Sequence, residues 1–412
     1  MKEAVVVSVV RTAVGKAPKG TLRYTRPDDL GAVAVKGAVD RVPALDPKEI
    51  EDVIIGCAMP EGEQGMNMAR LISLRAGLPI EAAAMTVNRY CASGLQTIAL
   101  AAERIRGGGA EVIVAGGAES MSYLPMGGNK IAVNPWLVDN HPDLFDGVTE
   151  AIGEVGGFSA TIGGRRIYAI QTAEKGMAWM RLTARGTAGH GSMLQPDNAV
   201  TEIAETVARI GRHEWPVRLT PSVTAFLAAA ADALGIEFTP DAADEVLAKL
   251  GPIARMVGAT LTSTVNPTAL KAGYKVNVVP QSATADVDGR FLPGHEEEFF
   301  AEVDELLGAG VKREFIHHDI ALETTFDGDL CAAMTGALLA EDPDARIAAY
   351  CLSGGTDAKS FSRLGIRCFG FTPLRLPADL DFAGMFHGVD ERVPVESLRF
   401  GVRVLDEFLD RC

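Results

Sequence analysis

The stretch NPWLVDNHPDLF (residues 134–145) divides the sequence into two parts that carry different motifs. No histidine precedes it, because all seven histidines of the chain lie at His141 or later. Independent domains usually meet across a linker rich in Pro, Gly and Ser, and no such linker is found here. The stretch could be a linker, a loop within one domain, or a seam where two incomplete parts meet, and the motifs on either side must decide.

Composition limits the classes of partner. A chain of 412 residues is long enough for two or three domains. Its net charge of −15 disfavours nucleic acid and anionic membrane surfaces, because both would repel it. The six cysteines form no CxxC pair, the first apolar run is too short for a signal peptide, and no run is long enough to span a membrane. We therefore expect a cytoplasmic protein with no nucleic-acid or membrane partner.

The first part alternates between strand and helix patterns. Helical spacing covers residues 28–42, 66–77 and 91–109, and short apolar runs at 52–59, 85–90 and 110–120 predict strands. The run EAVVVSVV (residues 3–10) predicts a further strand that is buried on both faces. Strands that alternate with helices predict a mostly parallel sheet.

The second part has a different organisation. Residues 176–186 alternate as a strand, residues 197–213 form an amphipathic helix, and residues 275–293 predict two strands joined by a turn. The Ala-rich region 224–258 has helical character and looks like an insertion. The chain ends in another predicted helix.

Cys91 is the first candidate for chemistry. It lies between a predicted strand and a long predicted helix, near unpaired backbone N–H groups and the positive end of the helix dipole. Such a position favours the thiolate nucleophile. The alternative is a structural cysteine, which is the commoner role of a free thiol.

The residues around Cys91 resemble the N-terminal part of thiolases (acetyl-CoA acyltransferases). The similarity covers residues 1 to about 140 and rests on four segments: RTAVGKAPKGTLRYTRPDD, GCAMPEGEQGMNMARLISLRAGLP, VNRYCASGLQTIALAAERI and VAGGAESMSYLPMGGNKIA. The resemblance implies a fold of two similar halves in which Cys91 accepts the acyl group of a coenzyme A thioester. It also implies two later residues, the His of a GHP motif and the Cys of a CxGGG motif.

Both later thiolase motifs are missing. The only His-Pro pair is His141-Pro142, which follows Asn, and CLSGGT at Cys351 matches the cysteine motif only superficially. Cys91 thus lacks its expected base, and acid–base help of this kind contributes roughly 10²–10⁴-fold. Coenzyme A thioester is accordingly a substrate only if this part functions.

Residues from about 136 to 412 resemble a second family, the M20 group of zinc-dependent peptidases and amidohydrolases. The matching segments follow in order: EAIGEVGGFS, TARGTAGHGSMLQPDNAV, KVNVVPQSATADVDGRFLPG, CLSGGTDAKSFSRLGI and FAGMFHGVDERVP. The resemblance implies two bound metal ions, a Glu that serves as general base for water, and a peptide or small-molecule substrate with an amide bond near a carboxylate.

The M20 resemblance assigns roles residue by residue. Glu154 and His387 fall on metal ligands. His190 falls on a histidine of the dimerisation domain that contacts the oxyanion in the partner's active site. Substrate contacts fall on Asn277, Arg290, Gly354 and Gly355, where an Arg would grip a carboxylate through its planar fork. Without the surrounding segments, His190 and His387 would be interpreted as turn and loop histidines.

The early M20 motifs are missing as well. The HxD motif, the bridging Asp and the Glu-Glu pair would lie before His141, where the chain has no histidine. His317-His318-Asp319 fits the pattern HxD but falls in a predicted strand, and Glu296-Glu297-Glu298 falls at a helix start. We therefore expect zinc to bind weakly or not at all.

These observations favour the interpretation that residues 134–145 are a seam where two incomplete parts meet. The predicted fold class is α/β: an incomplete thiolase-like unit (1–135) joined to an incomplete M20-like catalytic domain (136–175 and 321–412) that carries a two-layer α/β dimerisation domain (176–320) with a helical insertion. Three functions stay open. They are an M20 metallohydrolase with impaired catalysis, an incomplete thiolase-type acyltransferase, and an inactive chimeric chain. In the last case only the dimerisation domain is competent, and it forms a homodimer.

Overall fold

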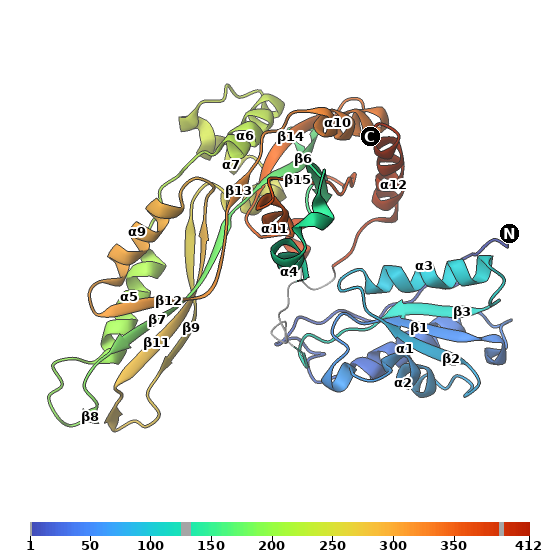
Figure 1. The fold of residues 1–412 in the computed structure, drawn as a ribbon, viewed down its shortest axis with the longest axis horizontal. Helices are drawn as coiled ribbons and strands as arrows, with labels where there is room; N and C mark the ends of the chain where they lie inside the picture. The colour runs from blue at the N-terminus through green and yellow to red at the C-terminus, as the bar shows by residue number, and fades with distance from the viewer. Residues whose placement is uncertain (1, 125–132, 387–390) are drawn as a thin grey trace. The chain divides into compact units, whose positions relative to one another are not determined.

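The computed structural model describes residues 2–124, 133–386 and 391–412 (Figure 1). The chain divides into two compact units. The first unit comprises Met1–Ile131 with Met385–Arg392, and the second comprises Ala132–Gly384 with Val393–Cys412.

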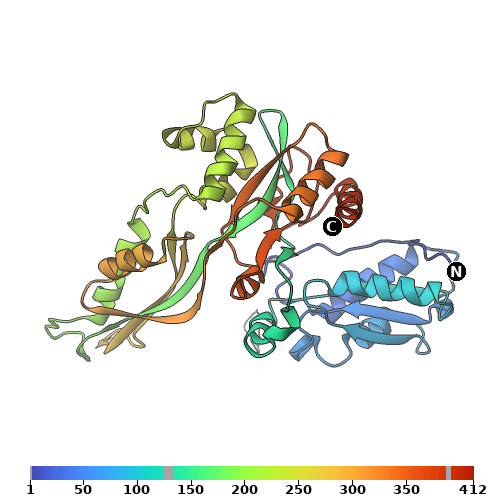
Figure 2. The same ribbon diagram turned by 45° about the horizontal axis from the view of Figure 1, so that its top comes forward.

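The first unit is built on a parallel sheet of three strands in the order β2-β1-β3. The strands are β1 (Asp52–Gly56), β2 (Ala83–Val87) and β3 (Ile113–Gly117). Helices α1 (Pro27–Asp40) and α2 (Met68–Arg75) lie on one face, and α3 (Ser93–Arg106) lies on the other (Figures 1 and 2). The predicted alternation of strands and helices and the parallel sheet are confirmed.

The predicted strand at residues 3–10 is wrong. This segment has no assigned secondary structure, and Val5, Val6, Val7 and Val9 are between 69% and 74% exposed. Residues 4–10 instead line a cavity of about 330 Å³ together with α1, α3 and β3. A strand needs hydrogen bonds to a neighbour, and this segment makes none with the free edge of β3.

The second unit contains a mixed sheet of six strands centred on β6. Its strands are β4 (Glu150–Gly153), β5 (Ser159–Ile162), β6 (Arg165–Glu174), β13 (Leu322–Glu323), β14 (Arg346–Leu352) and β15 (Arg367–Gly370). Side chains alternate across β6, so that Tyr168 and Ile170 enter one core and Ile167 and Ala169 enter another. Helices α10 (Asp329–Glu341) and α12 (Val395–Leu409) cover the first core.

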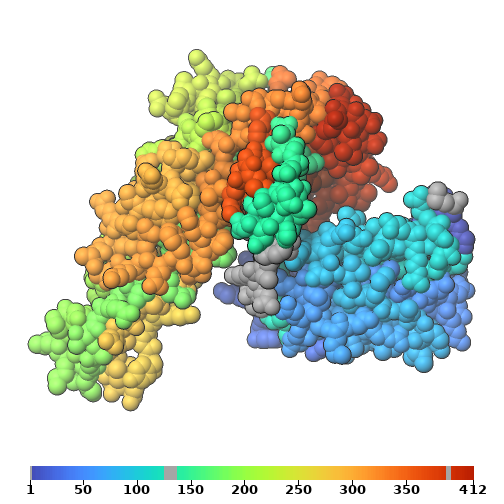
Figure 3. Space-filling view, in the orientation of Figure 1, coloured from blue at the N-terminus to red at the C-terminus, as the bar shows by residue number. Residues whose placement is uncertain are grey.

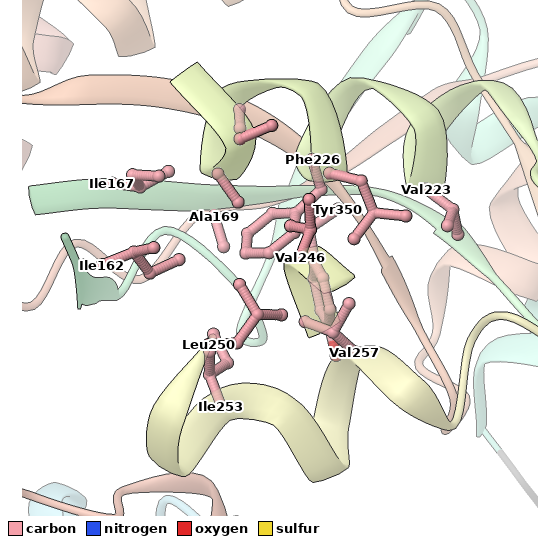
Figure 4. Packing of buried hydrophobic residues seen from close by; sticks show 14 of the residues in the cluster. Ile162, Ile167, Ala169, Val223, Phe226, Val246, Leu250, Ile253, Val257 and Tyr350 are labelled. Atoms are coloured by element: carbon pink, nitrogen blue, oxygen red, sulfur yellow. The ribbon is translucent and has the colours of Figure 1, made fainter. Parts of the chain in front are cut away.

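The second core lies under the predicted helical insertion. The insertion forms α6 (Pro221–Leu234), α7 (Ala243–Ala248) and α8 (Ala254–Gly258). Figure 4 shows Phe226 of α6, Val246 of α7 and Leu250, which follows α7, around Tyr350 of β14. The insertion is therefore helical as predicted, but it packs on β6 and β14 and not on the dimerisation sheet.

The opening stretch, residues 134–145, belongs to the second unit. It forms helix α4 (Val133–Asn140) followed by a short 3₁₀ helix, Pro142–Phe145. The Phe145 ring lies 5.3 Å from the Phe361 ring of α11 (Ala358–Ser362), and Asp139 pairs with Arg363. The stretch is thus packed structure and not a linker, and the boundary between the units falls just before it.

A separate antiparallel sheet forms the other lobe of the second unit, in the order β12-β7-β11-β9. Its strands are β7 (Gly176–Arg185), β9 (Thr264–Ala272), β11 (Ser282–Phe291) and β12 (Val311–Asp319). Helices α5 (Ala199–Arg212) and α9 (Glu296–Leu307) pack together on it around Ile203, Phe291 and Phe299. This is the predicted two-layer arrangement. Across the described ranges, no helix is long and apolar enough to cross a membrane.

Candidate functional site

Cys91 lies where the sequence predicts, directly before α3. The chain reaches it through Tyr90, which adopts a φ of 47°, in the left-handed region that bulky residues rarely occupy. The buried Ser93 hydroxyl fixes this turn, because it accepts from Arg89 N at 2.9 Å and donates to the Tyr90 carbonyl at 2.5 Å. The thiol is exposed, so a thioester could reach it.

The start of α3 lies directly against the carboxyl ends of the strands. A Cβ atom at Gly56, the last residue of β1, would lie 2.5 Å from the carbonyl carbon of Ser93. Glycine is required there because the backbone of the helix occupies that space. The sheet therefore fixes the position of the turn that carries Cys91.

Two of the predicted substrate contacts come together in the second unit. Arg290 on β11 pairs in register with Met177 on β7, and Met177 Cε lies 3.6 Å from where a Cβ of Gly355 would be. Gly354 and Gly355 form the loop after β14. The guanidinium of Arg290 is held by Asp288, with Nε 2.7 Å and Nη2 3.0 Å from the two carboxylate oxygens. A substrate carboxylate would have to compete with Asp288 for this fork.

His190 and Asn277 form a second pair at the other end of the sheet. His190 lies on β8 (Gly189–His190), which pairs with β10 (Val278–Val279), and Gly191 N donates to the Asn277 carbonyl at 2.9 Å. Both side chains are exposed, in a region visible in green and yellow at one end of Figure 3. The ten residues of β7 span roughly 30 Å. The side chain of His190 therefore cannot reach Arg290 of the same chain, because Arg290 lies beside the first residues of β7, at the opposite end of the sheet.

The predicted metal ligands do not form a site in the described residues. Glu154 follows β4 and is exposed, and its carbonyl accepts a hydrogen bond from Thr372. His387 lies outside the described residues. Among residues 2–124, 133–386 and 391–412, no three His, Cys, Asp or Glu side chains gather in a geometry that could hold a metal ion.

The two motif-like segments have structural roles. His317, His318 and Asp319 end strand β12, where His318 Nε2 lies 2.7 Å from Glu296 Oε1 and its ring stacks on Phe315. Glu296, Glu297 and Glu298 begin α9, where their charges complement the helix dipole. The predicted strand and helix start are confirmed.

A buried group of charges that no sequence pattern predicted lies beside the Gly354–Gly355 loop. Glu174, Lys175 and Lys359 are at most 2% exposed. Burial raises the pKa of the Glu174 carboxyl, while bonds from Thr356 oppose that rise. Burial lowers the pKa of Lys175 to about 8 and also lowers the pKa of Lys359. The sequence signal that could have found this group was Glu174-Lys175, a charged pair directly between two strand patterns. Charged residues are otherwise expected to be exposed.

Comparison with known proteins divides the chain in the same way. Residues 4–144 match the family model of the thiolase N-terminal domain, and residues 172–313 match that of the peptidase dimerisation domain. The first unit is thus similar to the thiolase N-terminal domain, and residues 172–313 of the second unit are similar to the peptidase dimerisation domain.

Individual similar proteins match different extents of the chain. A 3-ketoacyl-CoA thiolase of Bacillus subtilis is 54% identical over 145 residues, which are 35% of this chain and 37% of the relative. An M20 family metallo-carboxypeptidase of Sulfolobus solfataricus is 13% identical with a TM-score of 0.44, over 89% of this chain and 86% of its own. The Acat5 thiolase of Ascaris suum, solved with coenzyme A, is 35% identical with a TM-score of 0.29, over 30% and 32%. The chain spans little more than a third of the length of the curated thiolases that it matches.

Proposed function

We propose that the retained function of this chain is self-association. In this proposal residues 176–320 join two copies as a homodimer, and the M20-type hydrolase chemistry of the second unit is impaired. The observation that carries the proposal is the completeness of the two-layer lobe. Its four-stranded sheet, two helices and apolar core are all present in the structure, within the part of the chain that matches the peptidase dimerisation domain.

Two free sheet edges support a role in dimerisation. Strands β9 and β12 end the order β12-β7-β11-β9, so each has one side without a ladder partner in this sheet. Leu270 on β9 is 57% exposed and Phe315 on β12 is 46% exposed. An open edge with apolar side chains is a ready site for pairing with a second copy. A partner chain would also supply a His190 to the distant Arg290 end of the sheet.

The donor set supports the impaired hydrolysis. The M20 motifs that supply an HxD histidine and a Glu-Glu pair are missing from the sequence, and no three described His, Cys, Asp or Glu side chains are placed to hold a metal ion. Arg290 and the Gly354–Gly355 loop could still bind a carboxylate of a peptide or small amide. In this proposal these residues bind a ligand without effective metal-assisted hydrolysis of an amide bond.

The oligomeric state tests the main proposal. Sedimentation equilibrium of the full chain at micromolar concentration should give twice the chain mass of 43.5 kDa. Leu270→Lys and Phe315→Lys form a matched pair, because each places a charge on one of the two edges. One of them should yield monomers while the other leaves the dimer intact. A monomeric wild-type chain would refute the proposal.

Cys91 supports a second candidate function, acceptance of an acyl group. The observation in its favour is an exposed thiol on a fixed turn at the strand ends, in a region 54% identical to a thiolase. In this step the Cys91 thiolate attacks the thioester carbonyl, the bond to the coenzyme A sulfur breaks, and coenzyme A leaves as the thiol after taking up a proton. Incubation with acetyl-CoA should add one acetyl group to the wild type and none to Cys91→Ser. Equal labelling of both would exclude it.

A further inference from the structure

Three buried charges occupy the joint between the two sheets of the second unit. Strand β6 ends at Glu174 and β7 begins at Gly176, so Lys175 is the single residue that connects the sheets. Lys359, from α11, lies against the same point. Charged side chains are rarely buried without specific partners, so the partners of these residues indicate what they hold in place.

Glu174 holds the loop that follows β14. Its Oε2 accepts from the backbone N of Thr356 at 3.0 Å, and its Oε1 accepts from the Thr356 hydroxyl. Oε1 also accepts from Gln171 Nε2 at 3.0 Å. One buried carboxylate thus fixes both the N–H and the O–H of Thr356, the residue directly after Gly354 and Gly355.

Lys359 connects the same carboxylate to two chain crossings. Its Nζ lies 3.8 Å from Glu174 Oε2 and donates to the Lys175 carbonyl at 2.7 Å. It also donates to the carbonyl of Ile320, in the segment between β12 and β13. The chain passes between the two sheets at both of these carbonyls. One ammonium group therefore ties both crossings to the loop.

Lys359 occupies the space that a side chain at Gly355 would need. A Cβ atom at Gly355 would lie 2.7 Å from Lys359 Cε, which is closer than any ordinary contact. Gly355 is not among the residues with positive φ, so its backbone conformation does not require glycine. The missing side chain instead leaves room for Lys359 to reach the two carbonyls.

We propose that Glu174 and Lys359 form a buried latch that holds the Gly354–Thr356 loop at a fixed position on the joint between the two sheets. Both are positioning residues, because they act on the loop and on the crossings without facing the predicted ligand. The latch keeps Gly355 beside Met177 and hence beside the strand that carries Arg290. The role of the loop in ligand binding rests on the proposed function, but the latch itself does not.

Hydrogen exchange of the full chain, measured by mass spectrometry, tests the latch. Thr356→Val removes the hydroxyl that donates to Glu174 at nearly constant shape, and Thr356→Ser keeps it. In Thr356→Val, peptides covering residues 352–359 should exchange about tenfold faster than in wild type, since a hydrogen bond to a charged group contributes roughly that factor to an opening equilibrium. Thr356→Ser should retain wild-type protection.

Glu174→Gln and Lys359→Met extend the test to the charged partners. Both should speed exchange in residues 352–359 and at the joint, residues 172–178. The matched control is Asp342→Asn, which alters another buried carboxylate of the same unit that accepts from Tyr168 and Arg166. Its effect should not concentrate in these peptides. Equal protection in Thr356→Val and Thr356→Ser, or equal changes in the control, would overturn the latch.

The measurement separates the latch from the proposed function. Sedimentation of the same variants should still give the wild-type oligomer, because Thr356 and Glu174 lie away from the edges β9 and β12. If the wild-type chain is a monomer while Thr356→Val still loosens the loop, self-association fails and the latch stands. If a variant does not fold, the Thr356 pair decides alone, because the two variants differ in the hydroxyl, which donates to Glu174 and accepts from Ala358 N, at a partly exposed residue.

Discussion

Replacement of Lys175 by Met should change how the stability of the second unit depends on pH. The Lys175 ammonium is buried and donates to the carbonyls of Ala259 at 2.9 Å and Thr262 at 2.8 Å. Burial, with a smaller contribution from the nearby Arg290, lowers its pKa from 10.5 to about 8, while Cys351 and Asp288 act in the opposite direction. Methionine has a similar length and no titrating group.

The direction of the effect follows from proton binding. Between pH 8 and 10.5 the folded chain has released the Lys175 proton while the unfolded chain still holds it. Stability rises with pH wherever the unfolded state binds more protons. The contribution of Lys175 is therefore fully present above pH 10.5 and is lost as the pH falls through 8. At about 1.4 kcal/mol per pH unit, it amounts to roughly 3 kcal/mol.

Tryptophan fluorescence during urea unfolding is a suitable assay, because Trp136, Trp179 and Trp215 all lie in the second unit. The free energy of unfolding of wild type minus that of Lys175→Met should increase by about 3 kcal/mol between pH 8 and 10.5. The variant also loses the hydrogen bonds that Lys175 donates to two carbonyls, and this loss changes the difference in free energy by the same amount at every pH. Neighbouring Cys351 stays a thiol over this range, because burial raises its pKa to about 12. A difference that is constant with pH would refute the reasoning.

Four further predictions can be checked on the same protein. Iodoacetamide at pH 8 should label the exposed Cys91 and Cys412 quickly. Cys57 and Cys351 should be labelled only after unfolding, because burial raises the pKa of each thiol to about 12; rapid labelling of all six would contradict this. Phe226→Ala should destabilise the second unit by about 3–5 kcal/mol in urea unfolding, since this fully buried ring packs against Tyr350, whereas a cost below about 1 kcal/mol would mean that the insertion is not part of the core. A fragment of residues 176–320 in which a short Gly linker replaces residues 219–260 should unfold cooperatively, because Val217 and Thr262 pair across that gap. The same fragment without the replacement should aggregate, since its helices no longer pack on β6 and β14. Metal analysis after dialysis against zinc should find well below two ions per chain, and two tightly held ions would show that Glu154 and His387 have partners that we did not assign.

Local patterns predicted most elements of both units. The alternation of strands and helices before residue 120 and the alternating strand at 176–186 need only short-range periodicity, and the structure has these elements. Residues 3–10 are the exception. An apolar run of that length indicates a strand only when a neighbour supplies hydrogen bonds, and the structure provides none for it.

The candidate site was only partly predictable for the same reason. Motif positions placed Cys91 before a helix and assigned Arg290 and Gly355 to substrate contacts, and the structure places both of these residues beside Met177. Sequence could not show that Asp288 holds Arg290, because that ion pair depends on side-chain conformation. Nor could it show that the region 224–258 packs on β14, which begins 88 positions after that region ends.

The sequence by itself determined that different motifs lie on the two sides of residues 134–145 and that no histidine precedes His141. These conclusions depend on which residues are present, and no folding can add a missing ligand. Only the tertiary structure decided that Glu174, Lys175 and Lys359 come together at the joint between two sheets. Their burial is set by segments far apart in the chain, and it brings Glu174 and Lys359 into the contacts that hold the Gly354–Thr356 loop.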